Sequence, residues 1–386
     1  EIQSVREALE QQTLFYLYGN KTKQLCEKFA EMYGVNHCLT TSSGTAAVHT
    51  ALGALGVGPG DEVITAPITD MGSVIGILYQ NAIPVFADVD PHTYNMTAEN
   101  IEKKITDKTK AIVVVHLAGN PADMDSIMAV AKKHDIKVVE DCAQSYLSYY
   151  KGKLVGTFGD IGCFSLNDFK HISAGDGGMC ITNDEALYRR AFRFADKNYN
   201  RFGENLRDVV SLAPNYRINE LTSAVGLVQI GKLEKICSAR NHYGDRLSEG
   251  IRDLPGISIH QVNEGNKSSY WFYMFRLDEK AAGVTREKFL EALNAEGIPA
   301  EPYVPHCVYE YPLFANLNAF EGTKAPFDSP YYGRPVKYEK GLCPVAEEVL
   351  ATVIKLSVNE FYSERDLQET IEGIRKVSHY FASQQS

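Results

Sequence analysis

The segment from Phe164 to Gly178 places a lysine where an amine could do chemistry. An apolar run, Ile161 to Phe164, precedes the segment's polar turn, and a short β-like run, Met179 to Thr182, follows it. The turn between these runs carries Lys170. Residues at the ends of buried strands lie at the mouth of a cleft, where a partly desolvated ammonium becomes a usable nucleophile. Lys170 is therefore a candidate catalytic residue, although a surface lysine in a loop would fit the same pattern.

A second strand-like segment ends in carboxylates and supplies the partner that this lysine needs. Val138 and Val139 lead into Glu140 and Asp141. Pyridoxal phosphate (PLP) accepts electrons only while its ring nitrogen is protonated, and a carboxylate against that nitrogen keeps it so. Lys170 and Asp141 together therefore predict a PLP site, with Lys170 as the Schiff-base lysine and Asp141 as the partner of the ring nitrogen.

A predicted helix start near the amino end of the chain suits the cofactor's phosphate. Ser43, Gly44 and Thr45 follow a short strand pattern and open a helix that is rich in alanine. The free backbone N–H groups and the positive dipole end of such a helix attract phosphate. A plain helix cap is the alternative interpretation. The lysine and the aspartate elsewhere in the chain favour the phosphate site.

Taken in order, these motifs resemble those of the DegT/DnrJ/StrS family of PLP-dependent enzymes. The resemblance rests on Ser43-Gly44-Thr45, Asp141, Lys170 and Asn215-Tyr216-Arg217, and it covers nearly the whole chain. The family consists mostly of sugar aminotransferases with the fold of aspartate aminotransferase, fold type I. The resemblance therefore implies an aminotransferase that passes through pyridoxamine phosphate and moves an amino group from L-glutamate or L-glutamine to a keto sugar, nucleotide-linked or not, or to a cyclitol.

The resemblance also assigns roles to further residues. It implies Gly44, Thr45 and Ser165 at the cofactor phosphate, and Gln144 near the cofactor hydroxyl. It implies that Asn215 reaches the phosphate of the neighbouring subunit, so that a homodimer would share its active sites. Arg217 could hold the donor carboxylate or brace its own loop.

The substrate side of the site is less clearly marked. Relatives carry an aromatic residue that stacks on the cofactor ring near Pro67 to Ser73, where this chain offers Ile68, Asp70 and Met71 instead. The stacking residue is therefore left open. Because loops on a rigid scaffold carry specificity, the Pro- and Tyr-rich loop from 300 to 344 offers substrate candidates. These candidates are Tyr303, His306, Tyr331 and Tyr332.

Two other functions compete with transamination. Some members of the family are pyridoxamine-phosphate-dependent sugar 3-dehydratases, which have a histidine in place of the lysine. This chain has Lys170 at that place with His171 beside it, which favours transamination. A non-catalytic PLP-binding regulator is the second alternative, and the presence of both Lys170 and Asp141 disfavours it.

Short apolar runs at 62–66, 84–87 and 111–115 alternate with helix-like stretches and position these residues. This alternation predicts an α/β domain with a mostly parallel sheet buried on both faces. No G-x-G-x-x-G follows a strand, so a dinucleotide site is unsupported. A predicted helix from Leu221 to Ile236 leads to a smaller α+β region. We therefore divide the chain into residues 1–240, an arm and a large PLP-binding domain, and 241–386, a small C-terminal domain.

Composition restricts the partners and the compartment. The 386 residues are 44% hydrophobic and 23% charged, as in an ordinary globular protein. The net charge of −10 argues against a nucleic-acid partner. No apolar stretch is long enough to span a bilayer, and no signal pattern is visible, so we expect a cytoplasmic protein. The eight cysteines form no C-x-x-C pair, which predicts buried thiols and no metal site.

Overall fold

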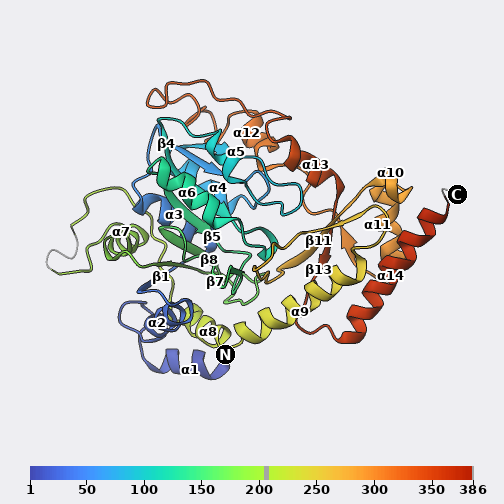
Figure 1. The fold of residues 1–386 in the computed structure, drawn as a ribbon. Helices are drawn as coiled ribbons and strands as arrows, with labels where there is room; N and C mark the ends of the chain where they lie inside the picture. The colour runs from blue at the N-terminus through green and yellow to red at the C-terminus, as the bar shows by residue number, and fades with distance from the viewer. Residues whose placement is uncertain (204–207, 385–386) are drawn as a thin grey trace.

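The computed structural model describes residues 1–203 and 208–384, and a seven-stranded sheet forms the centre of the large lobe in this part of the chain (Figure 1). Only β9 runs antiparallel to its neighbours, which confirms the predicted α/β fold with a mostly parallel sheet. In spatial order the strands are β1 (His37–Thr41), β9 (Gly178–Thr182), β8 (Ile161–Ser165), β5 (Lys137–Asp141), β4 (Thr109–Val115), β2 (Glu62–Thr65) and β3 (Ile83–Phe86).

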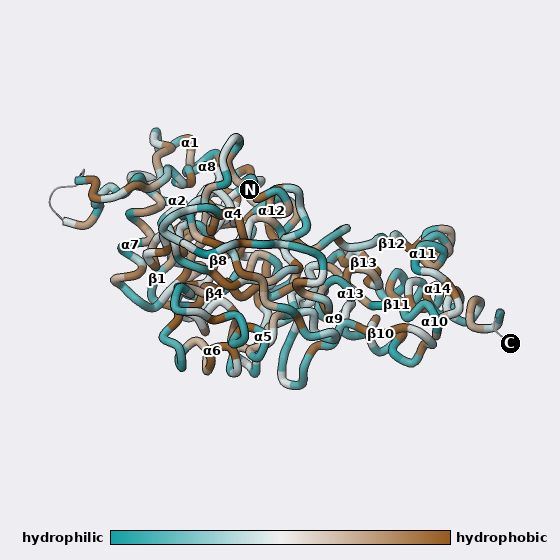
Figure 2. Tube along the Cα trace, turned by 90° about the horizontal axis from the view of Figure 1, so that it is seen from above, coloured by the Kyte–Doolittle hydropathy of each residue, from teal (hydrophilic) through white to brown (hydrophobic). Residues whose placement is uncertain are grey.

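Both faces of this sheet are buried, each in a separate core. Along β4, Val113 contributes to one core, whereas Ile112 and Val114 contribute to the other, because side chains alternate along a strand. Figure 2 shows the hydrophobic residues concentrated along these central strands. The helices over the first core are α3 (Gly44–Ala54), α4 (Gly72–Tyr79) and α7 (Glu185–Ala195), and those over the second are α2 (Lys21–Tyr33), α6 (Met124–Lys133) and the start of α9 (Leu233–Ile251).

Shorter elements complete the large lobe. The N-terminal α1 (Ile2–Glu10) packs on α8 (Glu220–Ile230), beside α2 (Figure 1). The remaining elements are α5 (Ala98–Glu102), the 3-10 turn η1 (Leu117–Gly119) and a hairpin of β6 (Tyr149–Tyr150) and β7 (Lys153–Leu154). Among the described residues, no helix is both long enough and apolar enough to cross a membrane.

The smaller lobe is an antiparallel sheet covered by helices, as predicted for the C-terminal region. Its core includes Phe275, Phe289 and Ile374. The strands, in spatial order, are β10 (Ile257–Ile259), β11 (Phe272–Leu277), β13 (Val353–Ser357) and β12 (Ala300–Glu301). The helices that cover it are α10 (Glu279–Ala282), α11 (Arg286–Ala295) and α14 (Glu364–Ser383), together with most of α9, whereas α13 (Pro344–Thr352) packs in the first core.

The connection between the lobes differs from the predicted single helix over Leu221 to Ile236. α8 ends at Ile230, and α9 begins at Leu233 and continues to Ile251, so two helices stand where one was expected. The apolar periodicity is continuous across both helices, which is why the break is not visible in the sequence. The expected domain boundary, between residues 240 and 241, falls inside α9, the long yellow helix of Figure 1.

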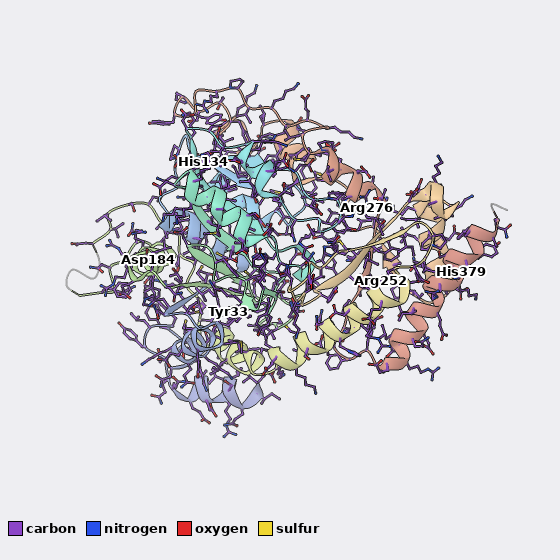
Figure 3. All side chains as sticks on the ribbon, viewed as in Figure 1. Tyr33, His134, Asp184, Arg252, Arg276 and His379 are labelled. Carbon is purple, nitrogen blue, oxygen red and sulfur yellow. The ribbon has the colours of Figure 1, made fainter. Side chains whose placement is uncertain are left out.

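The Pro- and Tyr-rich segment after β12 returns to the large lobe. Phe314 and Tyr338 pack edge-to-face against Phe86 of β3, with ring centroids 5.7 and 5.8 Å away. This segment contains η2 (Val308–Glu310) and α12 (Pro312–Ala315). Arg276 of β11, labelled between the lobes in Figure 3, donates to the Pro91 carbonyl and adds a polar contact between them. The two lobes are therefore joined by packing as well as by α9.

Candidate active site

A cavity of about 270 Å³ lies at the carboxyl ends of the parallel strands. Val115 ends β4, Asp141 ends β5 and Ser165 ends β8, and all three line the cavity. Ligands of open α/β sheets bind at this edge. The cavity brings together most of the cofactor-site residues predicted from the sequence, namely Gly44, Thr45, Asp141, Gln144, Ser165 and Lys170.

Lys170 extends into this cavity from the turn that follows β8. Burial lowers the pKa of its ammonium, and the charges of Asp141 and Asp70 oppose that effect. The Nζ atom lies 3.8 Å from the centre of the Trp271 ring. A lysine in these surroundings loses its proton more readily than one in water, which suits an amine nucleophile.

Asp141 is buried at the bottom of the cavity. Its carboxylate accepts hydrogen bonds from the Ser73 hydroxyl at 2.6 Å and from the Ala143 backbone N–H at 3.0 Å. Burial raises the pKa of Asp141, and the Ser73 hydrogen bond partly offsets the rise. A desolvated carboxylate of this kind gains most when a cation is placed beside it. The sequence analysis did not find Ser73, which stands in the first turn of α4 beyond the end of β2.

The opposite part of the cavity is formed by the start of α3. Ser43 caps the helix, with its hydroxyl accepting from the Ala46 N–H at 3.0 Å. Gly44 and Ser165 approach so closely that a Cβ on Gly44 would lie 2.6 Å from the Ser165 Cβ. The glycine therefore permits the helix start and the Ser165 hydroxyl to face one space, as a bound phosphate requires.

Gln144 is buried and its orientation is fixed. Its side-chain oxygen accepts from the Ala118 N–H at 2.8 Å. Burial raises the pKa of Tyr303, and a hydrogen bond with Gln144 works in the opposite direction. Tyr303 therefore stands next to a cavity residue, and its role at the substrate entrance remains a prediction.

Other predicted residues lie away from this cavity in the single chain. Asn215 is exposed beside Asp196. Arg217 donates to Asp196 at 2.7 Å, and Asp196 also accepts from Tyr16 and Arg201. This is the bracing role that the sequence left open for Arg217. The roles of Asn215 at a cofactor phosphate and of Arg217 at a donor carboxylate remain predictions.

Two substrate candidates also lie elsewhere. His306 is exposed, with its ring 6.4 Å from that of Tyr311. Tyr331 is 73% exposed, and its carbonyl accepts from Lys108. Its backbone adjoins Gly60, just before β2, at the amino ends of the parallel strands and therefore far from Asp141 in the sheet. Substrate roles for His306 and Tyr331 remain predictions that the single chain does not support.

His171 is oriented away from the cavity although it follows Lys170 in the chain. It is buried, and its Nε2 donates to the Ser269 carbonyl at 3.1 Å. Burial lowers its pKa to about 3, so the ring is neutral at physiological pH. Lys170, and not His171, is therefore the residue that faces the cavity, as transamination requires.

The place expected to hold a ring-stacking aromatic residue contains a carboxylate. Asp70 lines the cavity, and its Oδ1 accepts from the Gly72 N–H at 2.8 Å. Ile68 is buried, and Met71 packs against the first core. Of the three candidates in this segment, only Asp70 reaches the cavity.

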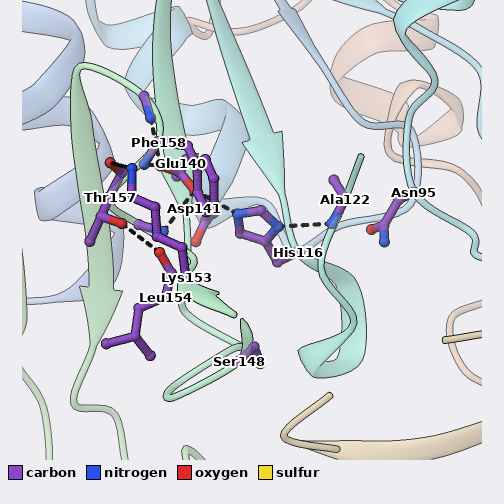
Figure 4. A network of polar contacts seen from close by, with 12 residues as sticks. Asn95, His116, Ala122, Glu140, Asp141, Ser148, Lys153, Leu154, Thr157 and Phe158 are labelled. Carbon is purple, nitrogen blue, oxygen red and sulfur yellow. Dashed lines mark hydrogen bonds and ion pairs between the residues drawn. The ribbon is translucent and has the colours of Figure 1, made fainter. Parts of the chain in front are cut away.

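A compact group of potential metal ligands lies next to Asp141 within the described residues (Figure 4). His116, Glu140 and Cys142 bring their ligand atoms within 4.8 Å of one another, and Figure 4 shows His116 beside Glu140. Glu140 accepts from His116 at 3.0 Å and from backbone N–H groups of the loop after β7, and the other His116 nitrogen accepts from Ala122. Burial raises the pKa of the Cys142 thiol. The Glu140 carboxylate and both His116 nitrogens are thus already engaged in hydrogen bonds, and these bonds support the strand end that carries Asp141.

The architecture places the protein in the class of fold-type I aminotransferases. The aminotransferase from Psychrobacter cryohalolentis superimposes with a TM-score of 0.86 at 28% identity, over 98% of this chain and 96% of that one. The chain belongs to the DegT/DnrJ/EryC1/StrS aminotransferase family, which matches residues 1–375.

Two relatives are similar over most of their length. A GDP-perosamine synthase from Escherichia coli O157:H7 is 36% identical, over 90% of this chain and 92% of the relative. A UDP-N-acetyl-3-dehydro-alpha-D-glucosamine 3-aminotransferase from Acidithiobacillus ferrooxidans is 33% identical, over 94% of this chain and 90% of the relative. The family membership predicted from the motifs is therefore confirmed, and so is the prediction that the protein is an enzyme of the aminotransferase type.

Proposed function

We propose that this aminotransferase uses PLP to move an amino group from L-glutamate or L-glutamine to a nucleotide-linked keto sugar. The observation that carries the proposal is that Lys170 and the buried Asp141 face one cavity beside a helix start. The names of the two relatives, which contain GDP and UDP, support a nucleotide-linked acceptor.

The residues present fit this cofactor. A bound PLP would supply an aldehyde carbon that bonds to an amine and a ring that takes up electrons. The Asp141 carboxylate would hold a proton on the ring nitrogen, and its burial strengthens that attraction. The start of α3, with Gly44, Thr45 and Ser165, would hold the phosphate.

Lys170 would serve two purposes. Its amine would bond to the cofactor before the donor arrives. Once displaced, the same amine would carry a proton between the donor's Cα and the cofactor's C4′. Burial lowers the pKa of the Lys170 ammonium, so this amine gives up its proton more readily than a lysine in water, which favours both purposes. One side chain would thus act as nucleophile, base and acid in each half of the reaction.

We also propose that the enzyme is a homodimer with shared sites, in which Asn215 of each chain reaches the phosphate held by the other. Exposed apolar side chains close to Asn215 support this. Val210 is 75% exposed and Leu212 is 95% exposed. Side chains of this kind are rarely left in water when a partner can cover them.

The absorption spectrum of the purified protein with PLP tests the function. We expect a yellow band from the cofactor bonded to Lys170, which bleaches when L-glutamate is added and returns with a keto sugar. Lys170→Met should bind the cofactor without the yellow band. Binding of pyridoxamine phosphate without this band in the wild type would favour a dehydratase. Failure to bind either form would refute the proposal.

A further inference from the structure

Trp271, the only tryptophan of the chain, holds the side chain of Lys170 on its ring. The Nζ atom lies 3.8 Å from the ring centroid, well inside the range of a cation–π contact. Trp271 immediately precedes β11 and therefore belongs to the small lobe. It approaches the lysine from outside the sheet that carries the rest of the cavity.

Three successive residues of the turn after β8, residues 169–171, contact the segment that contains Ser269 and Trp271. The Trp271 Nε1 donates to the Phe169 carbonyl at 2.6 Å, and the His171 Nε2 donates to the Ser269 carbonyl at 3.1 Å. Lys170, between them, contacts the ring itself. The position of the lysine relative to the indole is therefore determined from both sides.

The backbone of Trp271 is held in turn by both lobes. Its N–H donates to the Ala118 carbonyl at 3.0 Å, and its carbonyl accepts from Arg240 of α9 at 3.1 Å. Arg240 is also paired with Glu360 at 2.7 Å. The ring is half-buried and packs on Phe272, with centroids 4.9 Å apart. Such a ring is a fixed surface and not a mobile cover.

The carboxylates that line the cavity suggest a function for the face of the Trp271 ring. The charged groups that face Lys170 are Asp141 and Asp70, and Asp176 also lines the cavity. If the freed ammonium paired tightly with Asp141, it would compete for the carboxylate that the cofactor ring needs. An aromatic face attracts a cation without engaging either carboxylate.

We propose that Trp271 is a positioning residue for Lys170, whose indole face holds the free ε-ammonium at the wall of the cavity and away from Asp141. The part of this proposal that concerns the reaction rests on the proposed function. The contact itself exists in the cofactor-free chain and can be tested there. A purely structural Trp271 would instead act only through its Nε1 hydrogen bond to Phe169.

The first test uses the fluorescence of the single tryptophan in the cofactor-free protein. We expect Lys170→Met to brighten the emission, because a nearby ammonium quenches an excited indole by donating a proton to it. Lys153→Met is the matched control, since Lys153 lies 4.3 Å from the Phe158 ring centroid and has no part in the cavity. Emission from Lys170→Met that equals that of the control would overturn the proposal.

The second test separates the ring face from the hydrogen bond. Trp271→Phe keeps an aromatic face and loses the donor, whereas Trp271→Leu loses both. The pKa of Lys170 is measured in each cofactor-free variant by competitive acetylation followed by mass spectrometry. We expect the neutral fraction of Lys170 to rise about 5- to 30-fold in Trp271→Leu and clearly less in Trp271→Phe.

Equal values in the two variants would assign the effect to the lost hydrogen bond and refute a role for the ring. Neither test involves PLP, so a protein that fails to bind the cofactor leaves this inference intact and refutes only the proposed function. If Trp271→Leu does not fold, the fluorescence comparison still decides the question.

Discussion

At the scale of single residues, the ionised Asp141 side chain destabilises the folded protein when no cofactor is bound. Its pKa is raised by burial, so the folded protein binds its proton more tightly than the unfolded chain, and ionisation at neutral pH costs folding free energy. Asp141→Asn removes this charge, and the Ser73 hydroxyl can reverse its hydrogen bond to suit the amide.

We therefore expect Asp141→Asn to unfold at a higher temperature than the wild type at pH 7 without cofactor. The gain should disappear at a pH below the folded pKa of Asp141. Activity should fall by about 10²- to 10³-fold, a loss typical of removing one charge-stabilising group. Thermal unfolding at two pH values and the turnover rate check both parts. Wild-type turnover in this variant would show that Asp141 is not the partner of the ring nitrogen.

His171 gives a pH-dependent stability with a defined sign. Burial lowers its pKa from 6.5 to about 3, and among the described residues its Nδ1 has no hydrogen-bond partner. Between these two values the unfolded chain binds the proton and the folded chain does not, so stability falls as the pH falls. From pH 7 to pH 5 this group alone should cost about 2 kcal/mol of unfolding free energy.

His171→Gln tests this expectation, because the glutamine can still donate to Ser269 but does not titrate. Urea unfolding at pH 7 and pH 5 should show the smaller loss in the variant. His92→Gln, at an exposed position, serves as the control and should behave as the wild type. Equal losses in His171→Gln and the wild type would mean that the ring is protonated, and therefore more open to water than its burial indicates.

At the scale of elements, the meeting of α3 and β8 is the point where the fold depends on one glycine. A methyl group on Gly44 would lie 2.6 Å from the Ser165 Cβ, and neither the helix start nor the strand can move without disturbing the cavity. Gly44→Ala should cost about 1–3 kcal/mol of stability. It should also weaken PLP binding, because the start of α3 and Ser165, which are proposed to hold the phosphate, would be pushed apart.

Gly58→Ala is the control for this substitution, since a Cβ there meets no atom of residues 1–203 or 208–384 within 4 Å. Equilibrium unfolding and titration with PLP measure the two effects. If Gly44→Ala retained wild-type affinity for PLP, the phosphate would have to bind somewhere other than the start of α3.

At the scale of the whole molecule, the proposed shared site can be tested by mixing inactive chains. Lys170→Ala and Asn215→Ala should each be inactive as homodimers if Asn215 completes the partner's site. A mixed dimer would contain one site in which both residues are intact. After random reassociation about a quarter of wild-type activity should return. No recovery in a mixture shown to contain mixed dimers would place Lys170 and Asn215 in the same chain's site.

Much of the site could be predicted because its parts are local patterns. Lys170 and Asp141 each stand at the end of an apolar run, and buried parallel strands carry their carboxyl ends to one edge of a sheet. Ser43 and Gly44 show a helix start directly. These features depend on residues that are neighbours in the sequence, so local sequence patterns are sufficient to predict them.

The contacts between distant segments could not be predicted in this way. Trp271 stands in an aromatic run whose other members are buried in cores, and its contact with Lys170 depends on how the small lobe docks. Ser73 reaches Asp141 only because α4 begins beside the end of β5. Tyr331 was expected at the substrate entrance from its loop alone, but the segment returns to the opposite edge of the sheet.

The sequence by itself therefore determined the class of the protein, its α/β alternation with a mostly parallel sheet, and the lysine and aspartate at the centre of its chemistry. Only the tertiary structure decided that Lys170 and not His171 faces the cavity, and that Trp271 holds its amine. The physical reason is that the direction of a side chain and its contacts with distant segments depend on how whole helices and strands pack against one another. The spacing of neighbouring residues in the sequence does not contain that information.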